Sequence, residues 1–233
     1  AYDLELIKLC KPNIPILRFY GWQPYCISIG ANQSFSEIAK EKALNDNIDI
    51  VKRPTGGRAI LHAEELTYSV IMPNSEQVSG KNLYEDISKA IVWGLKNYDK
   101  NLNEAALESA NPNFRNLLQV PSGYVCFAST AKSEIKFKNK KLVGSAQRKL
   151  GSTILQHGSI LIGDFHKKLI KYLNLSSSEQ IKLYSEIENK TTDIFSIIGE
   201  NVNILKLQEK IIAGFENIFE AEFSIPKTEC TTL

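Results

Sequence analysis

Short runs of apolar, β-branched and aromatic residues recur through the first third of the chain. Gly and Pro separate these runs, which predict strands at 16–22, 25–31, 48–53, 58–62 and 66–73. The segment 36–46 interrupts them with a helical pattern, for which Ser36 is the expected N-cap. This part of the chain is therefore expected to be mainly β-sheet.

The next apolar pattern has the period of a helix. Large apolar residues recur at spacings of three and four and predict a core-facing helix at about 82–99, namely Tyr84, Ile87, Ile91, Leu95 and Tyr98. Residues 100–123 are rich in Asn, Pro and Gly and predict a long loop, a kind of segment that is more often functional than idle. This loop leads directly into Cys126.

Strands return in the middle of the chain, and helices follow. The pattern predicts strands at 133–138, 141–147 and 153–162, the first two joined by a lysine-rich turn. It predicts helices at 164–174, at 177–190 with Ser177 or Ser178 as cap, and at 203–220. There is no repeat and no linker, so we expect one catalytic domain over 1–233, with helices in 164–220 as scaffold.

Composition narrows the possible functions. Lys and Arg number 28 against 26 Asp and Glu, a net charge of only +2, which argues against a nucleic-acid partner. No apolar run approaches the roughly 18 residues that span a membrane, and the first residues lack the pattern of a secretory signal. The chain begins without an initiator methionine, so we expect its N-terminus to be truncated.

The cysteines indicate neither a metal site nor a disulfide framework. Cys10, Cys26, Cys126 and Cys230 are widely spaced, and only three histidines accompany them. We therefore expect no metal and a reducing, cytoplasmic location.

Two segments are unusual for a structural protein. In Arg53–His62, two adjacent glycines and two arginines lie between two predicted strands, where paired glycines allow close approach of the backbone to a ligand; an ordinary β-turn is the alternative. In 141–147 and 156–159, small residues on neighbouring strands leave space for an acyl chain, or else serve tight sheet packing.

Together with Cys126, these segments resemble the lipoate and biotin attachment family, which includes lipoyl ligases, octanoyltransferases and biotin ligases. The similar segments are 17–24, 53–69, 126–127 and 140–160, in the order that the family has, so the resemblance covers roughly residues 2–165. It implies an α+β fold, a mixed, largely antiparallel sheet flanked by helices, similar to the catalytic core of biotin ligases and class II aminoacyl-tRNA synthetases.

Within that family, the chain is most similar to the cysteine-dependent octanoyltransferases. Arg58 stands where the ATP-dependent ligases typically have a third glycine, and the helices after 165 are too few for the ligases' additional C-terminal domain. The resemblance thus implies a reaction without cofactor, whereas a ligase would need ATP and Mg²⁺. An adenylate loop of the biotin ligase type is absent from the sequence.

The resemblance implies a thioester mechanism. Cys126 would accept octanoyl from acyl carrier protein and pass it to a lysine of a lipoyl domain, such as glycine cleavage H protein or the E2 component of a 2-oxoacid dehydrogenase. A cation near the thiol would favour the thiolate, and by resemblance Lys141 is that neighbour and also stabilises the oxyanion. The structural alternatives are a buried, inert Cys126 and a solvated Lys141.

By the same resemblance, a further set of residues binds the acyl chain, the pantetheine arm or the acceptor lysine: Arg53, Gly56, Gly57, Arg58, His62, Tyr68, Gly144, Ser145, Ala146, His157 and Gly158. We expect the two histidines to line the pocket rather than act as bases, while His166 is expected at the surface. Basic residues could attract acidic carrier proteins, or simply be solvated: Lys132, Lys136, Arg148 and Lys149.

Other functions remain open at this point. One is an ATP-dependent lipoate ligase, in which Cys126 is incidental. Another is an amidotransferase that moves octanoyl or lipoyl between lipoyl domains with the same cysteine. A third is a non-catalytic carrier-binding protein, against which the presence of both Cys126 and Lys141 argues.

Overall fold

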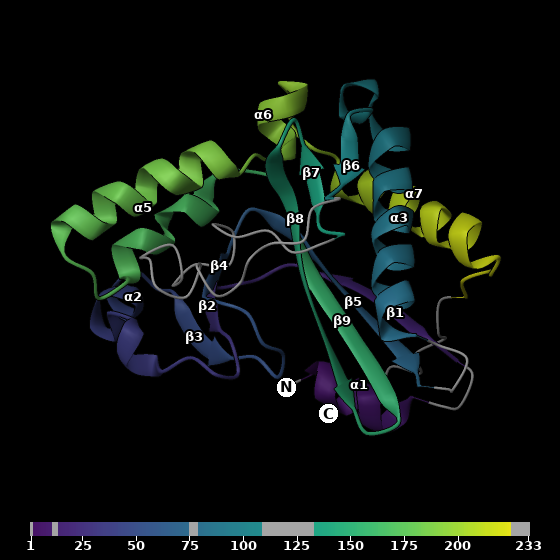
Figure 1. Ribbon diagram of the computed structural model, residues 1–233, viewed down its shortest axis with the longest axis horizontal. Helices are drawn as coiled ribbons and strands as arrows, with labels where there is room; N and C mark the ends of the chain where they lie inside the picture. Colours follow the sequence, from purple (N-terminus) through teal and green to yellow (C-terminus); the bar gives the residue numbers. More distant parts are fainter. Residues whose placement is uncertain (1, 11–13, 75–78, 109–132, 225–233) are drawn as a thin grey trace.

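The computed structural model describes residues 2–10, 14–74, 79–108 and 133–224. The described residues form two sheets flanked by helices (Figure 1). In the larger, 6-stranded sheet all neighbours pair antiparallel, in the order β1 (Ile16–Tyr20), β5 (Glu65–Pro73), β9 (Thr153–Leu161), β8 (Lys140–Leu150), β7 (Ile135–Phe137) and β6 (Ala105–Leu107).

The smaller, 3-stranded sheet is mixed. Its central strand β2 (Cys26–Ile29) pairs parallel with β3 (Asp49–Lys52) and antiparallel with β4 (Ile60–His62). The expected α+β fold with a mixed, largely antiparallel arrangement is confirmed, but the strands are divided between two sheets.

Each sheet has its own hydrophobic core. Helices α3 (Gly80–Tyr98) and α7 (Ile204–Phe219) pack on one side of the larger sheet, where Tyr68 and Val143 belong to the same buried cluster. Helices α2 (Lys40–Asn45), η5 (Phe165–Tyr172) and α5 (Ser177–Lys190) enclose a second cluster with the smaller sheet. Burial of these apolar faces is the main stabilising term of each half.

Short elements complete the described fold: α1 (Tyr2–Leu9), η1 (Phe35–Glu37), η2 (Lys100–Leu102) and α6 (Ile194–Ile198). Helix α1 lies near one end of the β8–β9 hairpin (Figure 1). No helix within the described ranges is long and apolar enough to cross a membrane.

Several boundaries differ from the sequence predictions. The helix expected over 36–46 divides into η1 and α2. Ser34, not Ser36, caps η1 through a reciprocal capping box with Glu37. Likewise Ser176, rather than Ser177 or Ser178, caps α5 with Glu179.

Other corrections concern residues 100–107 and 164–174. The first stretch forms η2 and β6 instead of a loop, because β6 completes the sheet edge beside β7; the remainder of the expected loop, 109–123, lies outside the described residues. The helix expected at 164–174 is a 3₁₀ helix, η5. Within it His166 is buried rather than at the surface, and its Nε2 lies 3.0 Å from Oγ1 of Thr191.

Candidate functional site

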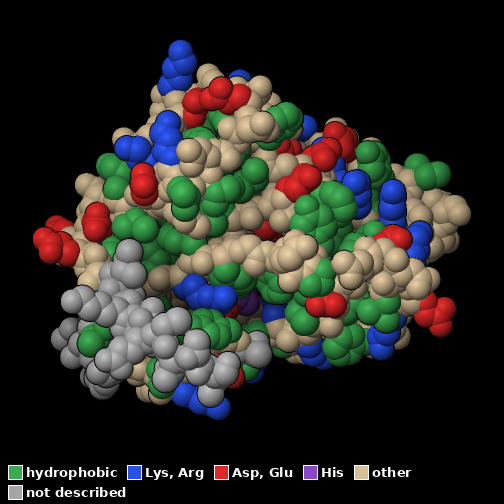
Figure 2. Space-filling view, turned by 180° about the vertical axis from the view of Figure 1, so that it is seen from behind, with side chains coloured by type: hydrophobic (Ala, Val, Ile, Leu, Met, Phe, Trp, Pro, Cys, Tyr) green, Lys and Arg blue, Asp and Glu red, His purple; other side chains and the backbone are tan. Residues whose placement is uncertain are grey.

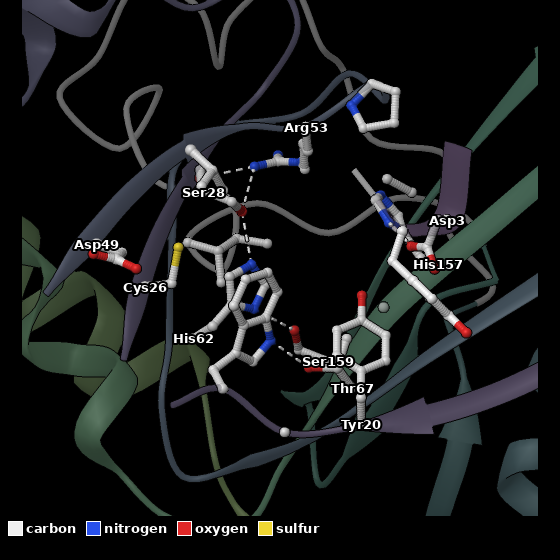
Figure 3. A pocket seen from close by; sticks show the side chains of 18 of the residues that line it. Asp3, Tyr20, Cys26, Ser28, Asp49, Arg53, His62, Thr67, His157 and Ser159 are labelled. Atoms are coloured by element: carbon white, nitrogen blue, oxygen red, sulfur yellow. Dashed lines mark hydrogen bonds and ion pairs between the residues drawn. The ribbon is translucent and has the colours of Figure 1, made fainter. Parts of the chain in front are cut away.

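A cavity of about 380 Å³ opens where the two sheets meet. This volume is within the range of roughly 300–1,000 Å³ of small-molecule sites. Strands of both sheets and helix α1 contribute to its walls (Figure 3). In the view from behind, a histidine side chain lies in a hollow beside Lys or Arg side chains (Figure 2).

The cavity brings together most of the predicted binding residues. Those that line it are Arg53, His62, Gly144, Ser145, Ala146, His157 and Gly158. Those absent from its described walls are Gly56, Gly57, Arg58, Tyr68 and Lys141. The apolar part of the wall includes Leu4, Trp22 and Ile60, which would suit a hydrocarbon chain.

Arg53 holds the glycine turn together from inside. Its Nη2 donates to the carbonyl oxygens of Gly56 and Arg58 at 3.1 and 2.6 Å, and its Nη1 donates to the Ser28 carbonyl at 2.9 Å. Gly57 has a φ of 94°, a conformation that favours glycine. The turn is thus shaped by a buried guanidinium, while Gly56 and Gly57 themselves are exposed.

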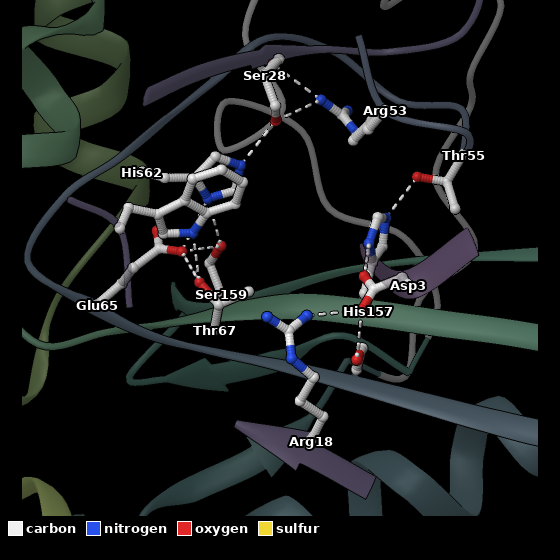
Figure 4. Close-up of polar contacts among 12 residues, drawn as sticks. Asp3, Arg18, Ser28, Arg53, Thr55, His62, Glu65, Thr67, His157 and Ser159 are labelled. Atoms are coloured by element: carbon white, nitrogen blue, oxygen red, sulfur yellow. Dashed lines mark hydrogen bonds and ion pairs between the residues drawn. The ribbon is translucent and has the colours of Figure 1, made fainter. Parts of the chain in front are cut away.

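His62 is at the centre of a buried hydrogen-bond cluster. Its Nε2 lies 2.7 Å from Oγ of Ser28, and its Nδ1 lies 2.8 Å from Oε1 of Glu65. Ser159 Oγ donates to the same Glu65 oxygen at 2.8 Å. These residues come from β2, β4, β5 and β9, so the cluster ties the smaller sheet to the larger one (Figure 4).

Trp22 covers this cluster. The indole ring stacks on the His62 imidazole with 4.4 Å between ring centroids and an interplanar angle of 16°. Its Nε1 donates to Oγ1 of Thr67 at 2.8 Å, and Thr67 in turn donates to Glu65. The stacking on Trp22 and the hydrogen bonds to Ser28 and Glu65 together hold the imidazole in one orientation.

A second polar group lies on the opposite wall. His157 Nε2 is 2.6 Å from Oγ1 of Thr55, and its Nδ1 is 4.0 Å from a carboxylate oxygen of Asp3 (Figure 4). Burial, and then the nearby positive charge of Arg53, lower the pKa of His157 to about 4. His157 is therefore a neutral wall residue at pH 7.

Asp3, which lines the cavity, attaches helix α1 to strands β1 and β5. Its Oδ1 accepts from Arg18 Nη1 at 2.8 Å and from Ser69 Oγ at 3.1 Å. The Arg18 guanidinium also lies over the Tyr20 ring, 3.8 Å from the centroid. Burial, followed by the Asp3 charge, raises the pKa of Tyr20, which stays protonated.

The small residues of β8 and β9 serve packing as well as the cavity. A Cβ on Gly158 would lie 2.5 Å from the Gly144 carbonyl oxygen and 2.7 Å from Tyr68 Cε1. Tyr68 is fully buried behind them, with its hydroxyl 2.7 Å from Ser145 Oγ. Burial raises the Tyr68 pKa to about 12, so this residue supports the wall from the core side.

Lys141 is buried instead of solvated. It lies on β8, three residues before Gly144, with its Nζ 2.8 Å from Oε1 of Glu134. The side chains are 1% and 4% exposed. A fully buried lysine is rare unless it is paired, so the solvated alternative is wrong.

The structure describes two of the four cysteines, Cys10 and Cys26. Cys126 and Cys230 lie outside the described residues. Cys26 is buried on β2 and lines the cavity, and burial, then the Asp49 charge, raise its pKa to about 12. Cys10 is partly exposed.

The basic residues expected to attract a carrier are not equally available. Lys136 forms an ion pair with Glu108, and Arg148 donates to the Pro54 carbonyl. Lys149 is exposed, and Lys132 lies outside the described residues.

Sequence reasoning missed several polar residues in or next to the cavity wall. Ser28 and Asp3 stand alone in their local sequence, and Thr55 lies in the segment Arg53–His62 without having been nominated, so only the tertiary fold joins them to a histidine. Glu65 carries a weak signal, because it is an acidic residue at the start of the apolar strand ELTYSVIMP. Trp22 and Ser159 lie in segments already noted for their resemblance, but neither residue was nominated.

Comparison with known proteins adds an independent result. A family model described as the lipoyl protein ligase A/B catalytic domain matches residues 1–216. Octanoyltransferase LipM of Clostridioides difficile is 36% identical over 217 residues, covering 91% of this chain and 78% of that protein. Octanoyltransferase LipM of Bacillus subtilis is 34% identical over 208 residues, covering 87% and 74%.

Solved structures agree in fold. A lipoate-protein ligase A bound with ATP superposes with a TM-score of 0.73 at 20% identity, covering 96% of this chain and 80% of that one. The bipartite lipoate protein ligase of Thermoplasma acidophilum gives 0.74 at 19% identity, covering 96% and 78%.

Proposed function

Because the chain belongs to the lipoyl protein ligase A/B catalytic domain family, we propose that it is a protein octanoyltransferase that acts through a thioester on Cys126. It takes octanoyl from acyl carrier protein and transfers it to a lysine of a lipoyl domain. The observation that carries this proposal is the 36% identity with an octanoyltransferase over 91% of the chain.

The chemistry of the reaction needs no ATP. Exchange of an acyl group between two thiols is nearly isoenergetic, and conversion of the enzyme thioester to an amide is strongly downhill. The enzyme therefore needs a thiolate, a site for the acyl chain and a cation for the oxyanion. The cavity between the sheets supplies a wall suited to the chain.

Lys141 is the proposed cation. A buried ion pair is weak support for stability, since the desolvation of both charges offsets much of their attraction. The fully buried Lys141–Glu134 pair thus favours a functional reason for the lysine. Removal of one oxyanion donor typically lowers a rate by about 10²- to 10³-fold.

The acceptors are lipoyl domains such as glycine cleavage H protein or the E2 component of a 2-oxoacid dehydrogenase. We place the reaction in a single catalytic domain, with Arg53, His62, His157 and the small residues of β8 and β9 around the acyl chain. Donor and acceptor proteins are the partners; no cofactor takes part.

Intact-protein mass after incubation with octanoyl-acyl carrier protein, without ATP, tests the proposal. Wild type should gain a hydroxylamine-labile octanoyl adduct that Cys126→Ala lacks, and added lipoyl domain should remove it. Cys10→Ala is the matched control, because it deletes another thiol that is partly exposed and does not line the cavity, and it should keep the adduct.

Each rival function gives a different result. A ligase would modify the lipoyl domain only with free octanoate and ATP. An amidotransferase would form the adduct from an octanoylated lipoyl domain but not from acyl carrier protein. A binding protein would form no adduct from either donor.

A further inference from the structure

We propose that helix α1 is a lid of the cavity, which opens to admit an acyl chain and is held closed jointly by Asp3 and by the bound chain. Helix α1 contributes Tyr2, Asp3 and Leu4 to the cavity wall. The inference deepens the proposed function and rests on it only for the class of ligand, an aliphatic acyl thioester. It concerns the opening and closing of the cavity and involves no reacting group.

Helix α1 differs from the other described parts of the wall. The remaining wall residues lie on strands of the two sheets or in the connections 21–24 and 53–54. Ladder hydrogen bonds and the cores behind them hold the strands in place, whereas no residue of α1 is buried and none belongs to a core cluster. A segment with few buried apolar contacts opens at a low cost in free energy. Among the described walls, α1 is therefore the one most easily displaced.

Asp3 attaches the helix to the larger sheet through polar contacts (Figure 4). Its Oδ1 accepts from Arg18 Nη1 on β1 at 2.8 Å and from Ser69 Oγ on β5 at 3.1 Å. The Arg18 guanidinium also lies over the Tyr2 ring, 4.6 Å from the centroid. The Arg18 and Asp3 side chains are 27% and 14% exposed, so water can solvate both charges when the pair separates. The attachment is thus reversible.

The second carboxylate oxygen of Asp3 has a weaker contact. It lies 4.0 Å from Nδ1 of His157. At pH 7 this histidine is neutral, because burial and then the charge of Arg53 lower its pKa to about 4. Among the described residues, Arg18 is therefore the charged partner on which the closed position of α1 depends.

The apolar side chains that α1 contributes to the wall have no place in either core. Tyr2 and Leu4 line the cavity but are 57% and 41% exposed. An octanoyl chain in the cavity would cover them and remove apolar surface of both protein and ligand from water. A bound chain therefore favours the closed position of the helix. An acetyl group has little apolar surface, so it favours this position far less.

The position of the lid and the affinity for the chain are thermodynamically linked. If a bound chain stabilises the closed lid, a substitution that opens the lid must weaken chain binding by the same factor. The apparent Kd rises in inverse proportion to the closed fraction. A variant in which about one molecule in ten is closed should therefore bind the chain about tenfold more weakly.

Binding of octanoyl-pantetheine to the whole chain tests the lid without a catalytic step. Cys126→Ala serves as the parent protein, so that no thioester exchange occurs, and the probe is uncharged. Asp3→Asn removes the charge that pairs with Arg18, and Leu4→Ser removes an apolar contact of the lid. Glu5→Gln is the matched control, because Glu5 is an exposed acid of the same helix that does not line the cavity.

Calorimetric titration should give a Kd that is about tenfold higher in Asp3→Asn and in Leu4→Ser than in the parent or in Glu5→Gln. Acetyl-pantetheine, measured by competition, should bind all four proteins with similar affinity. Amide hydrogen exchange along α1 should be fast in the ligand-free parent and should slow by about tenfold with octanoyl-pantetheine, but hardly with acetyl-pantetheine. Urea unfolding should be nearly the same in all four proteins, because α1 lies outside both cores.

Several results would overturn the lid. If α1 exchanges as slowly as β5 with and without octanoyl-pantetheine, the helix is a fixed wall. If Asp3→Asn and Glu5→Gln give the same Kd, the Asp3 charge does not hold the helix. If both probes lose affinity equally, α1 supports the fold and does not respond to the chain, and if the parent does not bind octanoyl-pantetheine, the lid has no ligand.

Failure of the proposed function gives a different pattern. Wild type would then form no adduct on Cys126 from octanoyl-acyl carrier protein, while the Cys126→Ala parent would still bind octanoyl-pantetheine and protect α1 from exchange. An adduct on wild type without protection of α1 would instead leave the proposed function intact and refute the lid alone.

Discussion

The Lys141 ammonium and the Glu134 carboxylate meet at 2.8 Å in the interior of the protein. Glu134 directly precedes β7, Lys141 lies on the neighbouring strand β8, and both side chains are buried. A pair of this kind is sensitive to the loss of one partner, because the remaining charge stays desolvated.

The first prediction follows from that pair. Glu134→Ala should lower the free energy of unfolding by about 3–5 kcal/mol, as is usual when one member of a buried pair is removed. Glu134→Gln keeps an acceptor oxygen and should lower it by less. Urea unfolding monitored by circular dichroism measures both; equal losses in the two variants would contradict the importance of the charge.

The second prediction concerns crowding beside Gly158. A methyl group there meets backbone and ring atoms at 2.5 and 2.7 Å, so Gly158→Ala should be destabilised by about 1–3 kcal/mol. Gly56→Ala is the matched control, since a Cβ at that position meets nothing within 4 Å and should leave stability nearly unchanged. Thermal unfolding of both variants decides, and similar losses would refute the packing argument.

The third prediction is a pH dependence of stability. Since the pKa of His157 is about 4 in the folded protein and about 6.5 when unfolded, the unfolded state binds more protons between these values. Stability should therefore fall as the pH drops from 6.5 towards 4, with about 2 kcal/mol lost through this residue by pH 5. Burial lowers the His166 pKa as well, which adds to the loss with the same sign.

His157→Asn should reduce that slope. Unfolding free energies at pH 7 and pH 5 for wild type and variant give the comparison. A slope unchanged in the variant would mean that His157 is not buried in its neutral form.

The fourth prediction separates the cysteines by reactivity. With a pKa of about 12 and almost no exposure, Cys26 should resist iodoacetamide in the folded protein. Cys126, if it is the thiolate nucleophile, should be alkylated much faster, and prior octanoylation should protect it. Peptide mass spectrometry after a short exposure measures both, with denatured protein as the reference; rapid labelling of Cys26 would show that its strand opens.

Much of the fold could be predicted because its signals are local. The stripe from Tyr84 to Tyr98 determines helix α3 almost to the residue. The helix caps were predictable too, because Ser34 and Ser176 each precede a glutamate by three residues. The predictions overlooked this spacing and named neighbouring serines. Strand β6 had no such signal, because among the described residues Ala105–Leu107 is held in the sheet by pairing with β7 alone.

The site was predictable in its sequence segments but not in its partnerships. Arg53, His62 and His157 were nominated, and they do meet in one cavity. What they bind depends on long-range contacts: Ser28 is 34 residues from His62, and Thr55 is 102 residues from His157. Single polar residues gain such roles from tertiary structure, which leaves no periodic pattern in the chain.

The separation of the two hydrophobic cores has a mechanical consequence. Among the described buried residues, Ile60 and Leu161 form a small apolar cluster apart from both cores, and Ile60 also lines the cavity. A ligand with an aliphatic chain would fill the cavity and add apolar contact between the two sheets, which the buried polar cluster around His62 also joins. Local opening should therefore be more frequent in the ligand-free protein, and amide hydrogen exchange along β2 and β4 should slow when a ligand fills the cavity.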